Sequence, residues 1–393
     1  MRARQPDRSG YAVNDGVRVY YEVHGSGSPT LLLMPSWAIT QSRTWKLQVP
    51  YLARHFRVVT FDARGNGLTD RPDTDAAYDA ERIVEDTLAV MDATGTDAAV
   101  FVALCTGTIW TTLLHQRHAD RMLGLVAISP NVLGDPPPWR RRSGRGFEAA
   151  LDTDEGWAKE TRAYWKRDWE GYVRFFAERM LPEPFSTKAY DDMVGWGLDT
   201  DAETILHDRD SSCALDVMTP EERVELCGSI SCPVLVIGGT ADEIVMPGRA
   251  VRLAEVTGGD LLMVEGGGHV PHARHPVVVN HAIKEFVDRI VPPLPRRTPW
   301  LFARNRTRAA LWVSSPIGLG HVLRDLAIAR AVRERVPDLR IEWWAQPPVT
   351  NVLAAAGEII HPVSQEMASE TEHWESEASD HDLHAFQAFR NMD

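Results

Sequence analysis

Cys105 has surroundings that favour covalent chemistry. It stands in the run Ala103-Leu104-Cys105-Thr106-Gly107, after an apolar segment at 98–102 and before a segment with helical character. A nucleophile that projects from a strand-to-helix turn needs small neighbours, because the turn is tight and strained. The helix N-terminus that follows favours the thiolate, the nucleophilic form of cysteine. A buried structural cysteine at a strand end is the alternative interpretation.

A second pattern lies upstream, at residues 61–72. This run, Phe-Asp-Ala-Arg-Gly-Asn-Gly-Leu-Thr-Asp-Arg-Pro, resembles the D-x-R-G-x-G-x-S-x-x-P segment of the α/β hydrolases, with Thr and Asp-Arg in the variable places. In that family the segment is a structural loop that follows a central strand. The resemblance covers about residues 15–290 and gives Cys105 the place where most relatives carry the nucleophilic serine.

The same resemblance implies a base and an acid downstream of Cys105. His269 follows Gly266-Gly267-Gly268, like the family's histidine after a glycine-rich turn, and Asp242 matches the acid turn after a late strand. The order nucleophile, acid, base agrees with this fold. Glu243 is the runner-up for the acid. Asp135 is a further alternative, because in some members the acid follows the strand predicted here at 124–128.

These residues imply hydrolysis through a covalent acyl intermediate. Cys105 would attack a carbonyl carbon and form a thioester. His269 would take the thiol proton and later protonate the leaving group or activate water, while Asp242 would fix the imidazole tautomer. A thiolate needs less help from a base than a serine does, so the expected substrates are activated carbonyl compounds: esters, thioesters and lactones.

The resemblance also implies an oxyanion hole made of backbone N–H groups. The expected donors are the amides of Trp37 and Thr106. Pro35 and Ser36 follow the predicted strand at 30–34, where the family usually has His-Gly. This departure leaves the geometry of the loop open.

The surrounding pattern is that of an α/β sheet with an insertion. Residues 17–23 alternate and predict an antiparallel edge strand. Short apolar runs predict buried parallel strands at 30–34, 57–61, 98–104, 124–128, 234–237 and 261–264, with helices near 79–94, 106–118, 248–257 and 276–290. Residues 135–225 do not follow this alternation of strands and helices, and they contain several tryptophans. We expect them to form a mostly helical lid over the active site.

The C-terminal part indicates further units. The hydrolase domain is expected to span 1–291, and the proline- and arginine-rich stretch 292–308 has the composition of a linker. Residues 309–365 resemble the first strand, turn and helix of glycosyltransferases that are built from two Rossmann-like domains. This covers a fraction of one Rossmann unit, so we assign no transferase activity; a small α/β appendage is the alternative. An acidic tail, 366–393, is expected to be solvated.

Composition limits the partners. The net charge of −13 argues against general binding to nucleic acid or anionic membranes. No stretch of ~18 apolar residues is present, and the N-terminus lacks the apolar segment of a secretory signal. We therefore expect a cytoplasmic protein that acts on a small-molecule acyl substrate without a cofactor.

The remaining histidines and cysteines are expected to be structural. His269, His272 and His275 are spaced by three, but Pro271 and Pro276 would interrupt a helix there, which argues against a metal site. The other cysteines show no zinc-site spacing and are expected to be buried free thiols: Cys213, Cys227 and Cys232.

Two other functions fit the same sequence. An amine or thiol could intercept the thioester, which would make the protein an acyltransferase. Alternatively, the hydrolase part could be a silent ligand-binding domain of a truncated glycosyltransferase fusion. The sequence leaves the substrate and the oligomeric state open.

Overall fold

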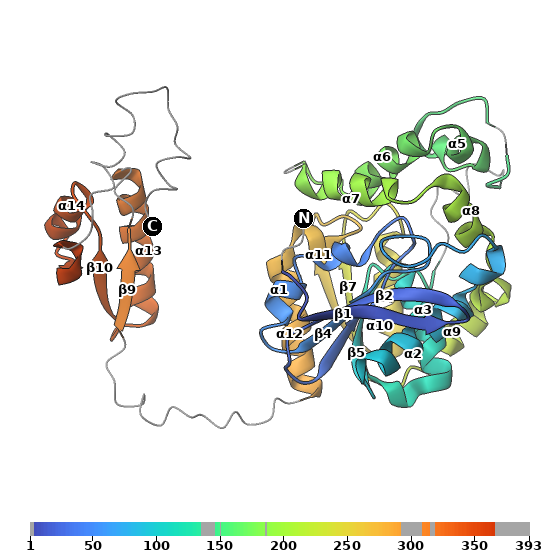
Figure 1. The fold of residues 1–393 in the computed structure, drawn as a ribbon, viewed down its shortest axis with the longest axis horizontal. Helices are drawn as coiled ribbons and strands as arrows, with labels where there is room; N and C mark the ends of the chain where they lie inside the picture. Colours follow the sequence, from blue (N-terminus) through green and yellow to red (C-terminus); the bar gives the residue numbers. More distant parts are fainter. Residues whose placement is uncertain are drawn as a thin grey trace. The chain divides into compact units, whose positions relative to one another are not determined.

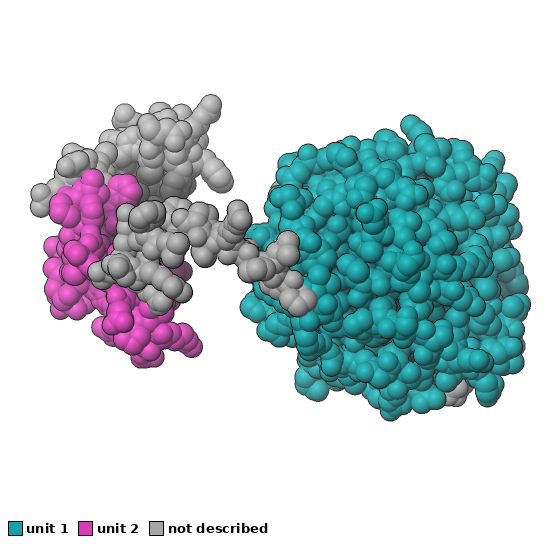
Figure 2. All heavy atoms as spheres, turned by 90° about the horizontal axis from the view of Figure 1, so that it is seen from below, with its two compact units in different colours: residues 1–294 teal, residues 295–393 magenta. Residues whose placement is uncertain are grey.

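The computed structural model describes residues 4–134, 146–149, 151–184, 187–291, 309–314 and 319–365 of the chain. The chain divides into two compact units, residues 1–294 and 295–393, which Figure 2 shows in two colours.

The larger unit contains one sheet of eight strands within the described residues, in the order β1-β2-β4-β3-β5-β6-β7-β8. The strands are β1 (Arg8–Asn14), β2 (Val17–His24), β3 (Thr30–Leu33), β4 (Arg57–Phe61), β5 (Ala99–Leu104), β6 (Met122–Ile128), β7 (Val234–Gly239) and β8 (Asp260–Val264). β2 pairs antiparallel with β1 and β4, and the pairs from β4 to β8 are parallel. All six side chains of β5 are buried, because helices cover both faces of a parallel sheet.

The prediction for the N-terminal edge was wrong. Residues 17–23 are not the edge strand, because β1 lies outside β2 and occupies that position. In β1 only Ala12 is fully buried, so the strand has no clear alternation to reveal it. The burial of six consecutive residues of β2 reflects its place between two neighbours.

Two groups of helices cover the sheet. α1 (Val49–Leu52) and α12 (Pro276–Ile290) contribute to one apolar core. α2 (Ala80–Thr94), α3 (Gly107–His118), α9 (Pro220–Gly228) and α10 (Pro247–Thr257) contribute to the other. Short helical turns connect these elements: η1 (Ser42–Trp45), η2 (Asp75–Tyr78), η3 (Ala119–Arg121) and α11 (Pro271–Arg274).

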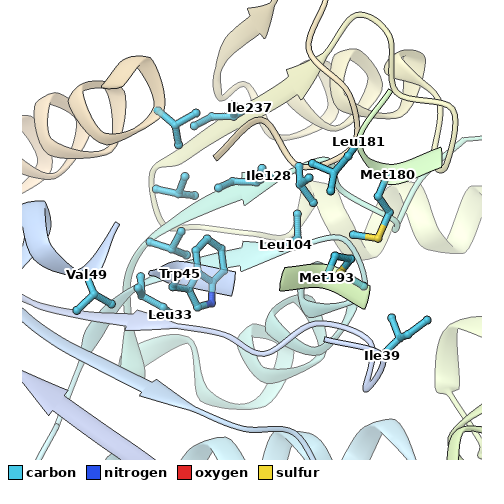
Figure 3. Packing of buried hydrophobic residues seen from close by; sticks show 14 of the residues in the cluster. Leu33, Ile39, Trp45, Val49, Leu104, Ile128, Met180, Leu181, Met193 and Ile237 are labelled. Atoms are coloured by element: carbon cyan, nitrogen blue, oxygen red, sulfur yellow. The ribbon is translucent and has the colours of Figure 1, made fainter. Parts of the chain in front are cut away.

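A helical insertion separates β6 from β7. Its described elements before α9 are η4 (Gly156–Lys159), α5 (Arg162–Arg167), α6 (Trp169–Met180), α7 (Lys188–Leu198), α8 (Ala202–Asp210) and η5 (Ala214–Val217). In Figure 1, α5, α6 and α7 gather beyond one end of the sheet. Figure 3 shows Met180 and Leu181 close to Leu104 and Ile128, the last residues of β5 and β6. The insertion therefore packs on the carboxyl end of the sheet.

The loop at 61–72 is fixed by buried charges. Asp62 accepts hydrogen bonds from the amides of Ser42 and Leu68 at 2.9 and 3.0 Å. Arg64 is 1% exposed and binds both carboxylate oxygens of Asp86 at 2.6 and 2.7 Å. These contacts give the loop the structural role that its resemblance to the family implied.

The smaller unit is a parallel sheet in the order β11-β10-β9. Its described elements are β9 (Ala309–Val313), α13 (Leu319–Arg335), β10 (Arg340–Trp344), α14 (Val349–Ala355), β11 (Ile359–Ile360) and η7 (Pro362–Gln365). The first strand and the helix that the resemblance implied are present, whereas the linker at 292–308, residues 315–318 before the helix and the acidic tail lie outside the described residues. In the part of the chain that is described, no helix has the length and apolar character needed to cross a bilayer.

The division into two units predicts that the larger one folds alone. A chain ending at Pro292 keeps every strand of the eight-stranded sheet, so it should remain soluble and unfold in one cooperative transition. Circular dichroism melting of this shortened chain, compared with the full chain, measures the outcome. Insolubility of the shortened chain would show that the two units share one core.

Candidate active site

Cys105 occupies a strained turn between β5 and α3. Its backbone has φ of +48°, a left-handed conformation that non-glycine residues rarely adopt. The Cys105 amide donates to the carbonyl of Ile128 at 3.0 Å, and the Thr108 hydroxyl donates to the Cys105 carbonyl at 2.5 Å. Strained residues of this kind cluster at active sites, where the surrounding structure holds them in place.

Gly107, two residues after Cys105, stands where there is no room for a side chain. A Cβ at Gly107 would lie 2.6 Å from the carbonyl oxygen of Pro35. Glycine therefore allows the start of α3 to approach the loop after β3. This close approach brings Thr106 and Trp37 to the same cavity.

His269 and Asp242 form a buried pair. The Nδ1 atom of His269 lies 2.9 Å from Oδ2 of Asp242, and both side chains are 2% exposed. The other carboxylate oxygen, Oδ1, accepts from the amides of Ile244 and Val245 at 2.8 and 3.1 Å. These amides fix the carboxylate, which in turn orients the imidazole.

Two glycine turns pack together to make this pair possible. A Cβ at Gly239 would lie 2.1 Å from the carbonyl oxygen of Gly267, so the turn bearing Asp242 and the turn bearing His269 meet backbone to backbone. The amide of Gly268 also donates to Oε1 of Glu183 at 2.8 Å. Glu183 belongs to the insertion and was not foreseen, because nothing in the local sequence connects it to a turn 85 residues away.

Cys105 contributes to the charge state of His269. Burial alone would lower the pKa of His269, but the charges and hydrogen bonds of Asp242 and Cys105 raise it to about 10. Burial also opposes the ionisation of Asp242, yet His269 and the two backbone amides keep the pKa of that carboxyl below its ordinary value. The interactions with Asp242 and Cys105 therefore favour the protonated form of the His269 imidazole.

Cys105 opens into a cavity of about 240 Å³. Trp37 and Thr106, the expected oxyanion donors, line it together with residues of the insertion, among them Trp157, Trp165, Phe176 and Asp208. The lining residues from the insertion were not foreseen individually, because their place in the cavity wall depends on the packing of η4, α5, α6 and α8.

Other predicted site residues lie elsewhere. Glu243 is half exposed and pairs with Arg179 at 3.2 Å, and Asp135 lies outside the described residues. His272 is fully buried, with Nε2 3.1 Å from the Thr44 hydroxyl. Within the described residues, no group of three or more His, Cys, Asp or Glu side chains could hold a metal ion.

The three remaining cysteines are free, and they differ in exposure. Cys227 is buried as expected, whereas Cys213 and Cys232 are only partly buried. The expectation of three buried thiols was therefore right for Cys227 alone.

Comparison with known proteins identifies the family. A family model described as alpha/beta hydrolase fold matches residues 29–276. Epoxide hydrolase A of Mycobacterium tuberculosis is 28% identical, over 70% of this chain and 95% of its own length. The 3-oxoadipate enol-lactonase 2 of Acinetobacter baylyi is 22% identical, over 70% of this chain and 94% of its own. Among solved structures, the enol-lactonase of Burkholderia xenovorans LB400 superposes with a TM-score of 0.56 at 22% identity, covering 71% of this chain and 99% of its own. The chain therefore belongs to the alpha/beta hydrolase fold family.

Proposed function

We propose that this α/β hydrolase cleaves a carboxylic ester, thioester or lactone through an acyl intermediate on Cys105. His269 serves as acid and base, and Asp242 is its partner. The observation that carries the proposal is the buried pair of His269 and Asp242, whose Nδ1 and Oδ2 atoms are 2.9 Å apart. The same imidazole also interacts with Cys105, which together with Asp242 raises the pKa of His269. The positive φ of Cys105 supports the same assignment.

The acylation step follows from this arrangement. The Cys105 thiolate attacks the carbonyl carbon of the substrate, and the carbonyl π electrons move onto oxygen. The amides of Trp37 and Thr106 stabilise the oxyanion; among the described residues, neither amide has a protein acceptor. When the tetrahedral intermediate collapses, the bond to the leaving oxygen or sulfur breaks and the His269 imidazolium donates the proton that the leaving group needs.

Deacylation uses the same groups in the opposite sense. His269, now neutral, takes a proton from a water molecule, whose oxygen attacks the thioester carbon. The carbon–sulfur bond then breaks, the carboxylic acid leaves, and Cys105 returns to the thiolate beside a protonated His269. An amine or thiol in place of water would give acyl transfer, so the acyltransferase alternative differs only in the acceptor.

The substrate class rests on chemistry and on the relatives. A thiolate is a better leaving group than an alkoxide, so a tetrahedral intermediate on Cys105 that also carries a simple alkoxide tends to expel the cysteine again. Acylation of Cys105 is therefore favoured when the substrate carries an activated leaving group. Two of the similar proteins named above are enol-lactonases, whose name denotes an activated cyclic ester.

The insertion serves in this proposal as a lid. Residues from η4, α5, α6 and α8 line the cavity with Cys105, which supports a role of residues 135–225 in shaping the substrate site. The smaller unit is proposed to be the first part of a Rossmann-like domain, supported by its parallel strand order. We propose a cytoplasmic location and assign the smaller unit no transferase activity.

Removal of the proposed nucleophile should abolish turnover. With p-nitrophenyl butyrate, Cys105→Ala and His269→Ala should each lower kcat by at least about 10³-fold, because each removes a participant in bond formation. Glu243→Gln is the matched control and should retain activity, since Glu243 pairs with Arg179 on the surface. Full activity in Cys105→Ala would exclude the cysteine mechanism, and inactivity of the wild type on ester, thioester and lactone panels would favour a silent domain.

The value of kcat/KM should fall only at strongly alkaline pH. The pKa of His269 is raised from 6.5 to about 10, so its imidazolium persists through neutral pH and is lost only as the pH rises through about 10. Because leaving-group protonation requires that proton, kcat/KM should decline near pH 10. Cys105→Ser removes one of the side chains that raise the pKa of His269, so the decline in kcat/KM should move to lower pH. A rise in activity centred near the ordinary histidine pKa would indicate a neutral histidine base instead.

Alkylation should distinguish Cys105 from the other thiols. Burial raises the pKa of Cys213, and it raises the pKa of Cys227 to about 12 and of Cys232 to about 11. Iodoacetamide at mildly acidic pH should therefore label Cys105 first, which peptide mass spectrometry can follow. Faster labelling of Cys213, which lines the same cavity, would contradict an activated Cys105.

A further inference from the structure

The cavity beside Cys105 contains a carboxylate that the proposed mechanism does not use. Asp208, near the end of α8, is half-buried and lines the same cavity as Cys105. The side chain of Trp37, the residue whose backbone amide is the proposed oxyanion donor, interacts with this carboxyl and acts to lower its pKa. Asp208 therefore lies where it can contact a substrate bound at Cys105.

The charge of Asp208 is poorly compensated by its surroundings. Burial raises the pKa of this carboxyl to about 7, although the Trp37 side chain and the positive charge of Arg209 act in the opposite direction. The Arg209 guanidinium lies 4.9 Å from the ring centre of Phe147 and is exposed. Tyr78, another lining residue, has a raised pKa, first through burial and then through the negative charge of Asp208.

Aromatic rings form the wall next to this carboxyl. The ring of Trp37 lies 5.8 Å from that of Trp165 and 5.3 Å from that of Phe176, and all three residues line the cavity with Trp157. Aromatic rings attract cations through their negative faces, and tryptophan does so most strongly. An aromatic wall with a weakly compensated carboxylate is complementary to an organic cation.

The charged residues of the described lining fit the same ligand. Three carboxylates, those of Glu160, Asp208 and Asp216, accompany two guanidinium groups, those of Arg209 and Arg249. Arg249 donates to the side chain of Asn131, so part of its hydrogen-bonding capacity is already used. The described lining thus has an excess of negative charge.

We propose that the substrate carries an alkylammonium group, which Asp208 and the aromatic wall bind while Cys105 attacks the acyl carbon. This inference rests on the proposed function, since it assumes that the cavity is the reacting site. Asp208 is then the specificity-determining residue. The ammonium group provides a counter-charge for the Asp208 carboxylate. Its alkyl substituents contact the rings of Trp37, Trp165 and Phe176.

Two matched thioesters test the proposal. Butyrylthiocholine and S-(3,3-dimethylbutyl) thiobutyrate have the same shape and differ in the charge of one atom. Thiol release gives kcat/KM for each in the wild type, in Asp208→Asn and in the control Asp210→Asn, which changes an exposed carboxylate of α8 that is not among the described lining residues. The wild type and the control should prefer the cationic thioester by about tenfold or more, and Asp208→Asn should lose most of that preference. Equal rates on both thioesters in the wild type, or an unchanged preference in Asp208→Asn, would overturn the proposal.

A binding measurement separates this proposal from the proposed function. Choline and its neutral analogue 3,3-dimethylbutan-1-ol can be titrated against tryptophan fluorescence, without any turnover. Tighter binding of choline than of the alcohol to the wild type, with weaker choline binding to Asp208→Asn, would support the cation site. This conclusion would hold even if neither thioester were cleaved. Failure to cleave them would count against the hydrolase mechanism and not against the cation site. Equal binding of both compounds, or no binding of choline, would overturn the cation site whatever the catalytic result.

Discussion

The site depends on the left-handed backbone conformation of Cys105. A non-glycine residue with φ of +48° is unfavourable in isolation, so neighbouring structure must hold it. β5 is buried on both faces and fixes the residue before the turn, and the hydrogen bond from the Cys105 amide to Ile128 anchors the turn to β6. Gly107 lets α3 begin against the carbonyl of Pro35. The result is a cysteine that lines the cavity between the carboxyl end of a central strand and the N-terminus of a helix.

The partners of Cys105 are positioned by a second constraint, the close packing of two glycine turns. Because Gly239 contacts the backbone of Gly267, the carboxylate of Asp242 comes within 2.9 Å of the His269 ring. Glu183 then ties the histidine turn to the helical insertion. The insertion therefore contacts the histidine turn and also forms part of the cavity wall.

The sequence was most informative where a motif is local. The turn around Cys105, the loop at 61–72 and the glycine turn before His269 are contiguous, and each could be recognised from a few residues. β1 was missed because only Ala12 of that strand is fully buried, which leaves no alternation. Glu183 and Asp208 were missed for a different reason: their contacts with Gly268 and Trp37 join segments far apart in the chain. Such contacts are determined by the packing of the insertion, which residue spacing does not encode.

The proposed mechanism requires the transfer of an acyl group to Cys105 during turnover. Rapid acid quenching of the protein with an activated ester, followed by intact-mass and peptide analysis, tests it most directly. We expect a mass increase of one acyl group on the peptide that contains Cys105, released by hydroxylamine and missing in Cys105→Ala. Turnover with the acyl group on another residue, or continued turnover by Cys105→Ala, would contradict it.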